Sequence, residues 1–186
     1  MKQISQIHFQ GPFKLHEHEN CVFDNKACNQ NGIYLWVIKE KTGCNYISYI
    51  GETGRTFRER LEEHILGMTS LNYRISDSEV RIHGKEKIIW KGHWRVKSIK
   101  ELINNYEKVS KYVTNHIKTY DIYLSSFKSD TTSRRRIEGE IGDVIKKYNK
   151  FFPNDNRIGW KTPNIKRNIK ITSEEELIGL PKDIYI

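Results

Sequence analysis

The sequence contains few cysteines and lacks any long hydrophobic run, and each shortage excludes a class of protein. Its three cysteines, Cys21, Cys28 and Cys44, cannot all pair within one chain, so we expect no disulfide framework. Cys21 and Cys28 follow His16 and His18, but this spacing matches no standard zinc finger. The first residues lack the apolar run of a signal peptide, and no stretch approaches the length of a membrane span. We therefore expect a cytoplasmic (intracellular) protein with reduced cysteines and no membrane partner.

The composition indicates a folded and strongly basic chain. Its 186 residues suffice for one hydrophobic core, and no repeat or low-complexity tract divides them, so we expect a single domain over 1–186. The hydrophobic fraction of 37% is low but is not that of a disordered chain, and ten tyrosines supply amphipathic surface. The net charge of +9 favours an anionic partner, of which nucleic acid is the commonest.

Residues 32–50 have the pattern of a β-hairpin. Side chains alternate between two faces over 32–39, a Lys-Thr-Gly turn follows at 41–43, and the Tyr- and Ile-rich segment 45–50 returns as a second strand. The alternation places Ile33, Leu35 and Val37 on one face of the first strand and Tyr34, Trp36 and Ile38 on the other.

The rest of the pattern predicts helices around one more strand. Apolar residues at spacings of four, four and three (Phe57, Leu61, Ile65 and Met68) predict a helix over 55–68. Residues 99–118 and 133–148 also have helical patterns, and 120–127 has a strand pattern. The order β-β-α-(insert)-α-β-α predicts an α+β fold with a small three-stranded antiparallel sheet flanked by helices. The core would span 30–152, with 69–98 as a basic insertion and with 1–29 and 153–186 as extensions.

The predicted hairpin and the helix after it carry side chains suited to phosphodiester chemistry. Arg60 and His64 are four residues apart, so they share one side of the helix, beside the strands that hold Tyr34 and Tyr49. Arginine matches the charge and geometry of a phosphate, and a carboxylate that holds one Mg²⁺ would stabilise the leaving oxygen. A phenol, with a usual pKa of about 10, needs nearby positive charge before it can act as a base at neutral pH.

These residues stand in a recognisable order: GIY at 32–34, YIG at 49–51, and then TGRTFRERLEEHI. The chain here resembles the GIY-YIG nuclease family, strongly over 32–66 and more weakly over 133–150. Its spacer between the triplets is longer than usual for the family, and one extra residue separates YIG from the arginine. The resemblance implies that Tyr34, Tyr49, Arg60 and His64 form the active site.

The same resemblance implies a metal-binding glutamate on a later helix, with an apolar residue three positions on. Glu138, followed by Ile141, fits this pattern, and would hold one Mg²⁺ per active site, with Mn²⁺ able to replace it. Periodicity alone does not choose between Glu138 and Glu140, because they lie on opposite flanks of the apolar stripe. Family members often carry an asparagine after this glutamate, and here Asn149, Asn154 and Asn156 all remain candidates.

Positive charge is concentrated in the segment 81–100, which holds seven Lys or Arg residues against one Glu. We interpret it as an insertion that contacts DNA through Lys85, Lys87, Lys91 and Arg95, although a solvated loop would have the same composition. The tryptophans within it, Trp90 and Trp94, would either stack on bases or fill a local core. The stretch 161–170, and the three arginines at 134–136 that open the last helix, are further candidates for phosphate contacts.

The sequence therefore favours a Mg²⁺-dependent endonuclease acting on double-stranded DNA, with Tyr34 as the preferred base and Tyr49 in support. The absence of a separate DNA-binding module suits a restriction-type enzyme that works as a homodimer, since one active site cuts one strand. The alternatives are a repair or structure-selective nuclease, a non-catalytic nucleic-acid-binding module, and an RNA-binding protein.

Overall fold

The predicted hairpin forms one edge of a larger sheet. In the computed structural model, β2 (Gly32–Lys39) and β3 (Asn45–Thr53) pair antiparallel, with Tyr34 opposite Gly51 and Trp36 opposite Tyr49. The structure describes residues 4–16, 19–93, 99–149 and 168–186. The other elements are β1 (Gln6–Lys14), η1 (Val22–Asp24), η2 (Lys26–Asn29), α1 (Phe57–Thr69), β4 (Ile75–Ser76), α2 (Ser78–Arg81), β5 (Ile88–Trp90), α3 (Ile99–Lys118), β6 (Tyr120–Ser126), α4 (Thr131–Tyr148), β7 (Asn168–Ser173) and β8 (Asp183–Tyr185).

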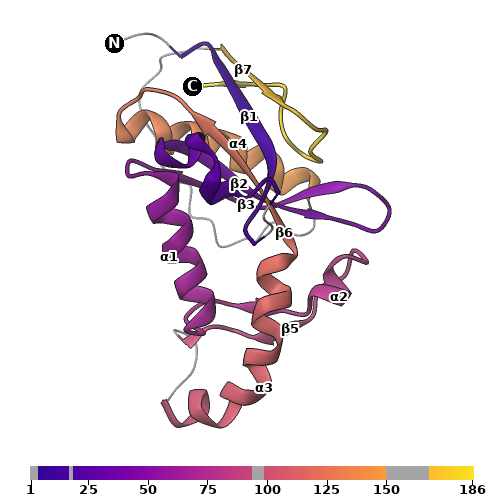
Figure 1. The fold of residues 1–186 in the computed structure, drawn as a ribbon. Coiled ribbons are helices and arrows are strands. Elements are labelled where there is room, and N and C mark those ends of the chain that lie inside the picture. The colour runs from indigo at the N-terminus through magenta and orange to yellow at the C-terminus, as the bar shows by residue number, and fades with distance from the viewer. Residues whose placement is uncertain (1–3, 17–18, 94–98, 150–167) are drawn as a thin grey trace.

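The main sheet has six strands in the order β3-β2-β6-β1-β7-β8, and Figure 1 shows helices on both sides of it. Its strands pair antiparallel except β1 and β7, which are parallel, so the sheet is mixed. The expected small three-stranded antiparallel sheet is therefore wrong. The three predicted strands are present as β3, β2 and β6, but β1, β7 and β8 extend the sheet beyond β6.

The three strands that were not predicted lie in 1–29 and 153–186, the segments expected to be extensions. Ile7 and Phe9 of β1 are buried, and their exposed neighbours alternate with them, but Pro12 made the segment look irregular. Ile169 and Ile171 of β7 alternate in the same way over a strand of only six residues. Because the partners of β1 are remote in sequence, no local turn signal indicated that these strands join the sheet.

The two faces of β2 belong to two separate hydrophobic clusters, as the alternation predicted. Tyr34, Trp36 and Ile38 pack in one cluster with residues of α1 and α3, including Phe57, Leu61, Val109 and Val113. Ile33, Leu35 and Val37 pack in the other, with Ile137, Ile141 and Ile145 of α4. The sheet therefore separates α1 and α3 from α4.

Helix α1 begins and ends close to the predicted bounds. Thr56 and Glu59 form a capping box: the Thr56 side chain accepts from the Glu59 N–H, and the Glu59 side chain accepts from the Thr56 N–H. The expected stripe is buried at Phe57, Leu61 and Met68 and partly buried at Ile65. This cap fixes the first turn of the helix, which Arg60 closes by donating its N–H to the Thr56 carbonyl.

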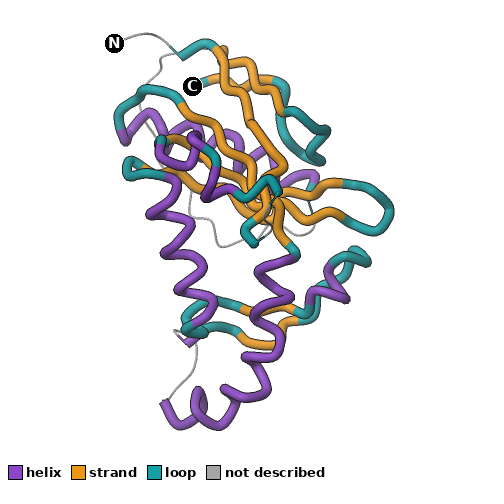
Figure 2. Tube along the Cα trace, viewed as in Figure 1, coloured by secondary structure: helices purple, strands orange, loops and turns teal. Residues whose placement is uncertain are grey.

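The predicted insertion folds against α3, whose bounds match the predicted 99–118. Strands β4 and β5 form a separate two-stranded ribbon that contacts α3, which runs away from the main sheet together with α1 (Figure 2). Trp90 is buried and donates its indole N–H to the Leu71 carbonyl at 2.7 Å, so this tryptophan fills a local core. Among the described helices, none combines the length and the apolar character needed to cross a membrane.

Candidate active site

The two sequence triplets require glycine for steric reasons. A Cβ on Gly51 would overlap the phenol ring of Tyr34, which lies opposite it on the neighbouring strand. Gly32 has φ of +151°, and a Cβ there would overlap the Ser125 carbonyl of β6. Glycine at these two positions therefore lets the Tyr34 ring pack closely against β3 and lets β2 approach β6.

Hydrogen bonds join three of the predicted site residues. The Tyr34 hydroxyl lies 2.8 Å from Nε2 of His64 and accepts from Nε of Arg60 at 3.1 Å. Arg60 also donates from Nη1 to Glu63 at 2.9 Å. The Tyr49 ring completes the group, with centroid distances of 6.0 Å to Tyr34 and 5.5 Å to His64. The structure thus brings together Tyr34, Tyr49, Arg60 and His64 from β2, β3 and α1.

His64 is neutral in this group and is hydrogen-bonded to Tyr34. Burial lowers the pKa of His64 to about 3, and the charge of Arg60 acts in the same direction. Nε2 of His64 shares a hydrogen bond with the Tyr34 hydroxyl, whose oxygen also accepts from Nε of Arg60. The imidazole tautomer sets which of the two groups donates. His64 therefore orients the phenol of Tyr34.

Both phenols are protonated at neutral pH in this arrangement. Burial raises the pKa of Tyr34 well above its usual value, and the nearby charge of Arg60 only partly offsets this. Burial also raises the pKa of Tyr49, and the second cause is the negative charge of Glu138. A cation close to Glu138 would remove that second cause.

Glu138 reaches the site from the opposite face of the sheet. Helix α4 packs on β3, which is an edge strand of the main sheet. The Glu138 carboxylate accepts a hydrogen bond from the backbone N–H of Glu52, and burial, followed by the charge of Glu52, raises the pKa of Glu138 to about 7. Glu140 is exposed. The structure therefore directs Glu138, and not Glu140, to the edge of β3 that carries Tyr49.

The surroundings of Glu138 fit a bound cation. A half-buried carboxylate beside a second carboxylate is costly to ionise, and a divalent ion would offset that cost. Glu52 is a poorer metal ligand, because Arg134 and Arg135 pair with its two carboxylate oxygens at 3.1 and 3.3 Å. Glu138 is accordingly the residue that would hold Mg²⁺ or Mn²⁺.

The pairing of Glu52 with Arg134 was not predicted, and it changes the interpretation of the arginines at 134–136. Arg134 is buried, donates to Glu52, and also donates to the Ser129 carbonyl at 2.7 Å. Its guanidinium therefore anchors α4 to β3 and does not face a phosphate. Asp130 caps the helix by accepting from the Ser133 N–H at 2.8 Å. Sequence spacing gave no signal that residues 82 apart would form this ion pair.

One of the three candidate asparagines has a structural position. Asn149 is buried at the end of α4 and donates its amide to the Ile47 carbonyl of β3. Asn154 and Asn156 lie outside the described residues. Asn149 thus links the C-terminal end of α4 to β3, the strand that carries Tyr49.

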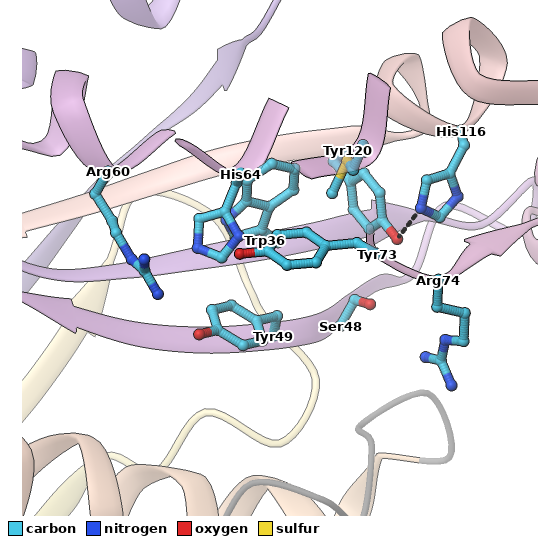
Figure 3. Close-up of a pocket in the computed structure, with 10 residues that line it drawn as sticks. Trp36, Ser48, Tyr49, Arg60, His64, Tyr73, Arg74, His116 and Tyr120 are labelled. Atoms are coloured by element: carbon cyan, nitrogen blue, oxygen red, sulfur yellow. Dashed lines mark hydrogen bonds between the residues drawn. The ribbon is translucent and has the colours of Figure 1, made fainter. Parts of the chain in front are cut away.

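A cavity of about 310 Å³ adjoins the group. Tyr49, Arg60 and His64 line one end of it, and Arg74 and His116 lie at the other (Figure 3). The exposure of Arg60 to this cavity leaves its charge accessible, whereas Tyr34 is fully buried and does not line it.

The basic insertion presents less charge than its sequence indicated. Lys85, Lys87 and Lys91 are exposed, and Lys87 pairs with Asp77 at 3.1 Å. Arg81, by contrast, has a side chain only 1% exposed. Arg95 and Trp94 lie outside the described residues, as does most of the basic stretch 161–170.

No group of three or more His, Cys, Asp or Glu side chains that could hold a metal occurs in the described part of the chain. Comparison of the chain with models of protein families, with curated proteins and with solved structures finds no match.

Proposed function

We propose that this chain is a Mg²⁺-dependent endonuclease of the GIY-YIG type that hydrolyses phosphodiester bonds in DNA. The observation that supports this most is the convergence of Tyr34, Tyr49, Arg60, His64 and Glu138, from four separate elements, on one edge of the sheet. An isolated pair of strand tyrosines would have an ordinary structural explanation. The accessible arginine and the half-buried carboxylate beside them supply the two charges that phosphodiester hydrolysis needs.

Arg60 is positioned to stabilise the charge that develops on the phosphate. Tyr34 holds its Nε and Glu63 holds its Nη1, so the guanidinium has a fixed orientation while the side chain stays 29% exposed. A fixed cation loses little entropy when it binds a phosphate, and it acts without reorganising during the reaction.

Tyr49 is the phenol better placed to accept a proton from the attacking water. Tyr34 is fully buried, whereas Tyr49 is partly exposed and lines the cavity. Tyr34, which the sequence favoured as the base, is better suited to hold Arg60 and His64. Mg²⁺, when held by Glu138, would stabilise the leaving oxygen. It would also offset the charge of Glu138, which after burial is the second cause of the raised pKa of Tyr49, and together with the charge of Arg60, which lowers that pKa, it would favour the deprotonated phenol that a base requires.

The substrate that we propose is double-stranded DNA, cut in the manner of a restriction enzyme by a homodimer. Each copy has one group of the kind described, and two cuts in opposite strands need two such groups. Lys85, Lys87 and Lys91 offer exposed cations for phosphate contacts. Light scattering with and without DNA measures how many copies of the chain form the assembly.

Incubation of the protein with mixed plasmid DNA and Mg²⁺ tests the proposal. Discrete fragments indicate restriction, a smear indicates cutting without sequence preference, and intact DNA with every divalent ion favours a binding module without activity. EDTA should stop the reaction, and Mn²⁺ should restore it.

The matched pair Glu138→Gln and Glu140→Gln assigns the carboxylate. Glu138→Gln should lower single-turnover cleavage by orders of magnitude, because Mg²⁺ loses its protein anchor, while DNA affinity is kept or increased. Glu140→Gln removes an exposed charge and should cut nearly as well as the unmodified protein. A dead Glu140→Gln with a normal Glu138→Gln would reverse the assignment.

A further inference from the structure

The cavity beside Tyr49 and Arg60 has the size and the lining of a small-molecule pocket. At about 310 Å³ it lies at the lower end of the roughly 300–1,000 Å³ typical of small-molecule pockets. Its walls are largely aromatic, with Trp36, Tyr49 and Tyr73 among them. Figure 3 shows the Tyr73 ring between the end that carries Arg60 and the end that carries Arg74. A planar apolar group of modest size suits these walls.

Tyr73 is placed in the cavity by a close approach to α1. A Cβ on Gly67 would overlap the Tyr73 ring, so the glycine lets this ring pack directly on the helix. The ring also contacts His64, with a centroid distance of 5.7 Å. Tyr73 is therefore a fixed wall whose neighbour is part of the candidate active site.

The end of the cavity remote from Arg60 presents hydrogen-bond donors. Arg81, which is buried behind it, donates to the Ser48 hydroxyl at 3.2 Å and to the Tyr120 hydroxyl. Each hydroxyl thus accepts from an arginine and keeps its own hydrogen to donate. Ser48 and Tyr120 both line the cavity.

His116 adds to this polarity. Its Nδ1 accepts from the Ser76 N–H at 3.3 Å, so the ring hydrogen of the neutral imidazole is on Nε2, 3.4 Å from the Tyr120 hydroxyl (Figure 3). The buried indole N–H of Trp36 has no acceptor among the described residues.

Arg74, which pairs with Glu86 at 3.4 Å and is 37% exposed, places a guanidinium at the end of the cavity remote from Arg60. A ligand that reaches this end needs acceptors on its edge.

Resting on the proposed nuclease function, we propose that the cavity receives an unstacked nucleobase next to the phosphate bound by Arg60. Aromatic walls stack on any base, and the donors at the end of the cavity remote from Arg60 select a base whose edge presents acceptors. Guanine fits best through its N7 and O6 edge, which presents two acceptors, whereas thymine presents one acceptor, O4, on the corresponding edge, and adenine and cytosine each place an amino donor there. A second phosphate would satisfy the donors but not the aromatic walls.

This pocket makes substrate choice depend on how easily the base leaves its stack. Extruding a base from a duplex costs a few kcal/mol and costs least at a mismatch or in a single strand. The chain should therefore cut at a guanine next to the scissile phosphate, and should cut faster when that guanine is mismatched.

Cleavage of oligonucleotides tests the pocket in the context of the reaction. Once the cut site is mapped, duplexes that differ only at the flanking base should be cut at least tenfold faster with guanine than with 7-deazaguanine, adenine or an abasic site. Tyr73→Ala should abolish this discrimination, and Tyr73→Phe, which keeps the ring, should retain it. Tyr106→Ala, an exposed tyrosine on α3 outside the cavity, is the matched control and should change nothing. Equal cutting of all four substrates would overturn the proposal.

Binding without cleavage separates this proposal from the proposed function. In an NMR titration of the full chain, guanosine 5′-monophosphate should shift the indole signal of Trp36, and ribose 5-phosphate should not. Gly67→Ala, whose methyl group displaces the Tyr73 ring, should weaken guanosine monophosphate binding by at least tenfold. A chain that binds the nucleotide but cuts no DNA keeps the pocket and overturns the nuclease. A chain that cuts DNA but binds ribose 5-phosphate equally well overturns the pocket.

Discussion

At the scale of single residues, the raised pKa of Glu138 makes the stability of the protein depend on pH. The folded state keeps a proton on Glu138 up to about pH 7, whereas the unfolded chain releases it near the usual value of 4.5. Because the folded state binds this proton more tightly than the unfolded chain does, protonation of Glu138 stabilises the fold. This stabilisation is fully present below pH 4.5 and is lost as the pH rises through 7. Glu138→Gln should therefore raise the free energy of unfolding at pH 8 by about 1–3 kcal/mol and change it little at pH 4.

Urea unfolding at the two pH values, without divalent ions, measures this difference. Glu140→Gln serves as the control, since Glu140 is exposed and removal of its charge should have a similar small effect at both. An equal gain for Glu138→Gln at pH 4 and pH 8 would show that the carboxyl titrates normally in the fold.

The two tyrosines should respond differently when each loses its hydroxyl. Tyr49→Phe should reduce single-turnover cleavage by orders of magnitude at every pH, because the proton acceptor is gone. Tyr34→Phe should cut more slowly and also loosen Arg60, so it should weaken DNA binding as well as cleavage. A Tyr49→Phe protein that cuts at the normal rate would return the role of base to Tyr34.

The sequence was informative for those site residues that share a local pattern. Tyr34, Tyr49, Arg60 and His64 lie within one hairpin and the helix after it, so their proximity follows from short-range geometry. Glu52 and Arg134 meet only because α4 packs across the edge of β3, and no pattern in the sequence encodes that contact.

At the scale of elements, the capping box of α1 should stabilise the helix that carries Arg60 and His64. Thr56→Ala leaves the Glu59 N–H at the helix start without its side-chain acceptor. It should lower the free energy of unfolding by about 1 kcal/mol, which is typical for the loss of an N-terminal cap. Thr69→Ala, at the other end of the same helix, is the control, because its hydroxyl bonds only a local carbonyl. Chemical denaturation compares the two.

Helices were easier to predict than strands for a physical reason. The apolar stripes of α1, α3 and α4 repeat over at least three turns, so each helix is evident from its own sequence. Strand β7 has six residues and β8 has three, and each depends on remote partners for its hydrogen bonds. Short alternating segments become strands only where the sheet accepts them, which local sequence does not specify.

At the scale of the whole molecule, the exposed lysines of the insertion should set the salt dependence of DNA binding. Replacing Lys85, Lys87 and Lys91 by Ala should weaken affinity and reduce the slope of log affinity against log salt by about 0.9 for each phosphate that a lysine no longer neutralises. Lys87, which pairs with Asp77, should contribute least. Lys108→Ala with Lys111→Ala, on the exposed side of α3, is the control pair. An unchanged slope in the triple variant would place the DNA elsewhere.

The position of β1 between β6 and β7 determines when the sheet can be completed as the chain leaves the ribosome. β1 is the first strand to be synthesised, but its antiparallel partner begins at Tyr120 and its parallel partner at Asn168. Until that last segment emerges, Ile7 and Phe9 lack the strand that pairs with them in the finished sheet. A nascent chain halted before residue 168 would already carry every proposed site residue. It would nevertheless present an unpaired strand edge with exposed apolar side chains, which is the kind of surface that chaperones bind.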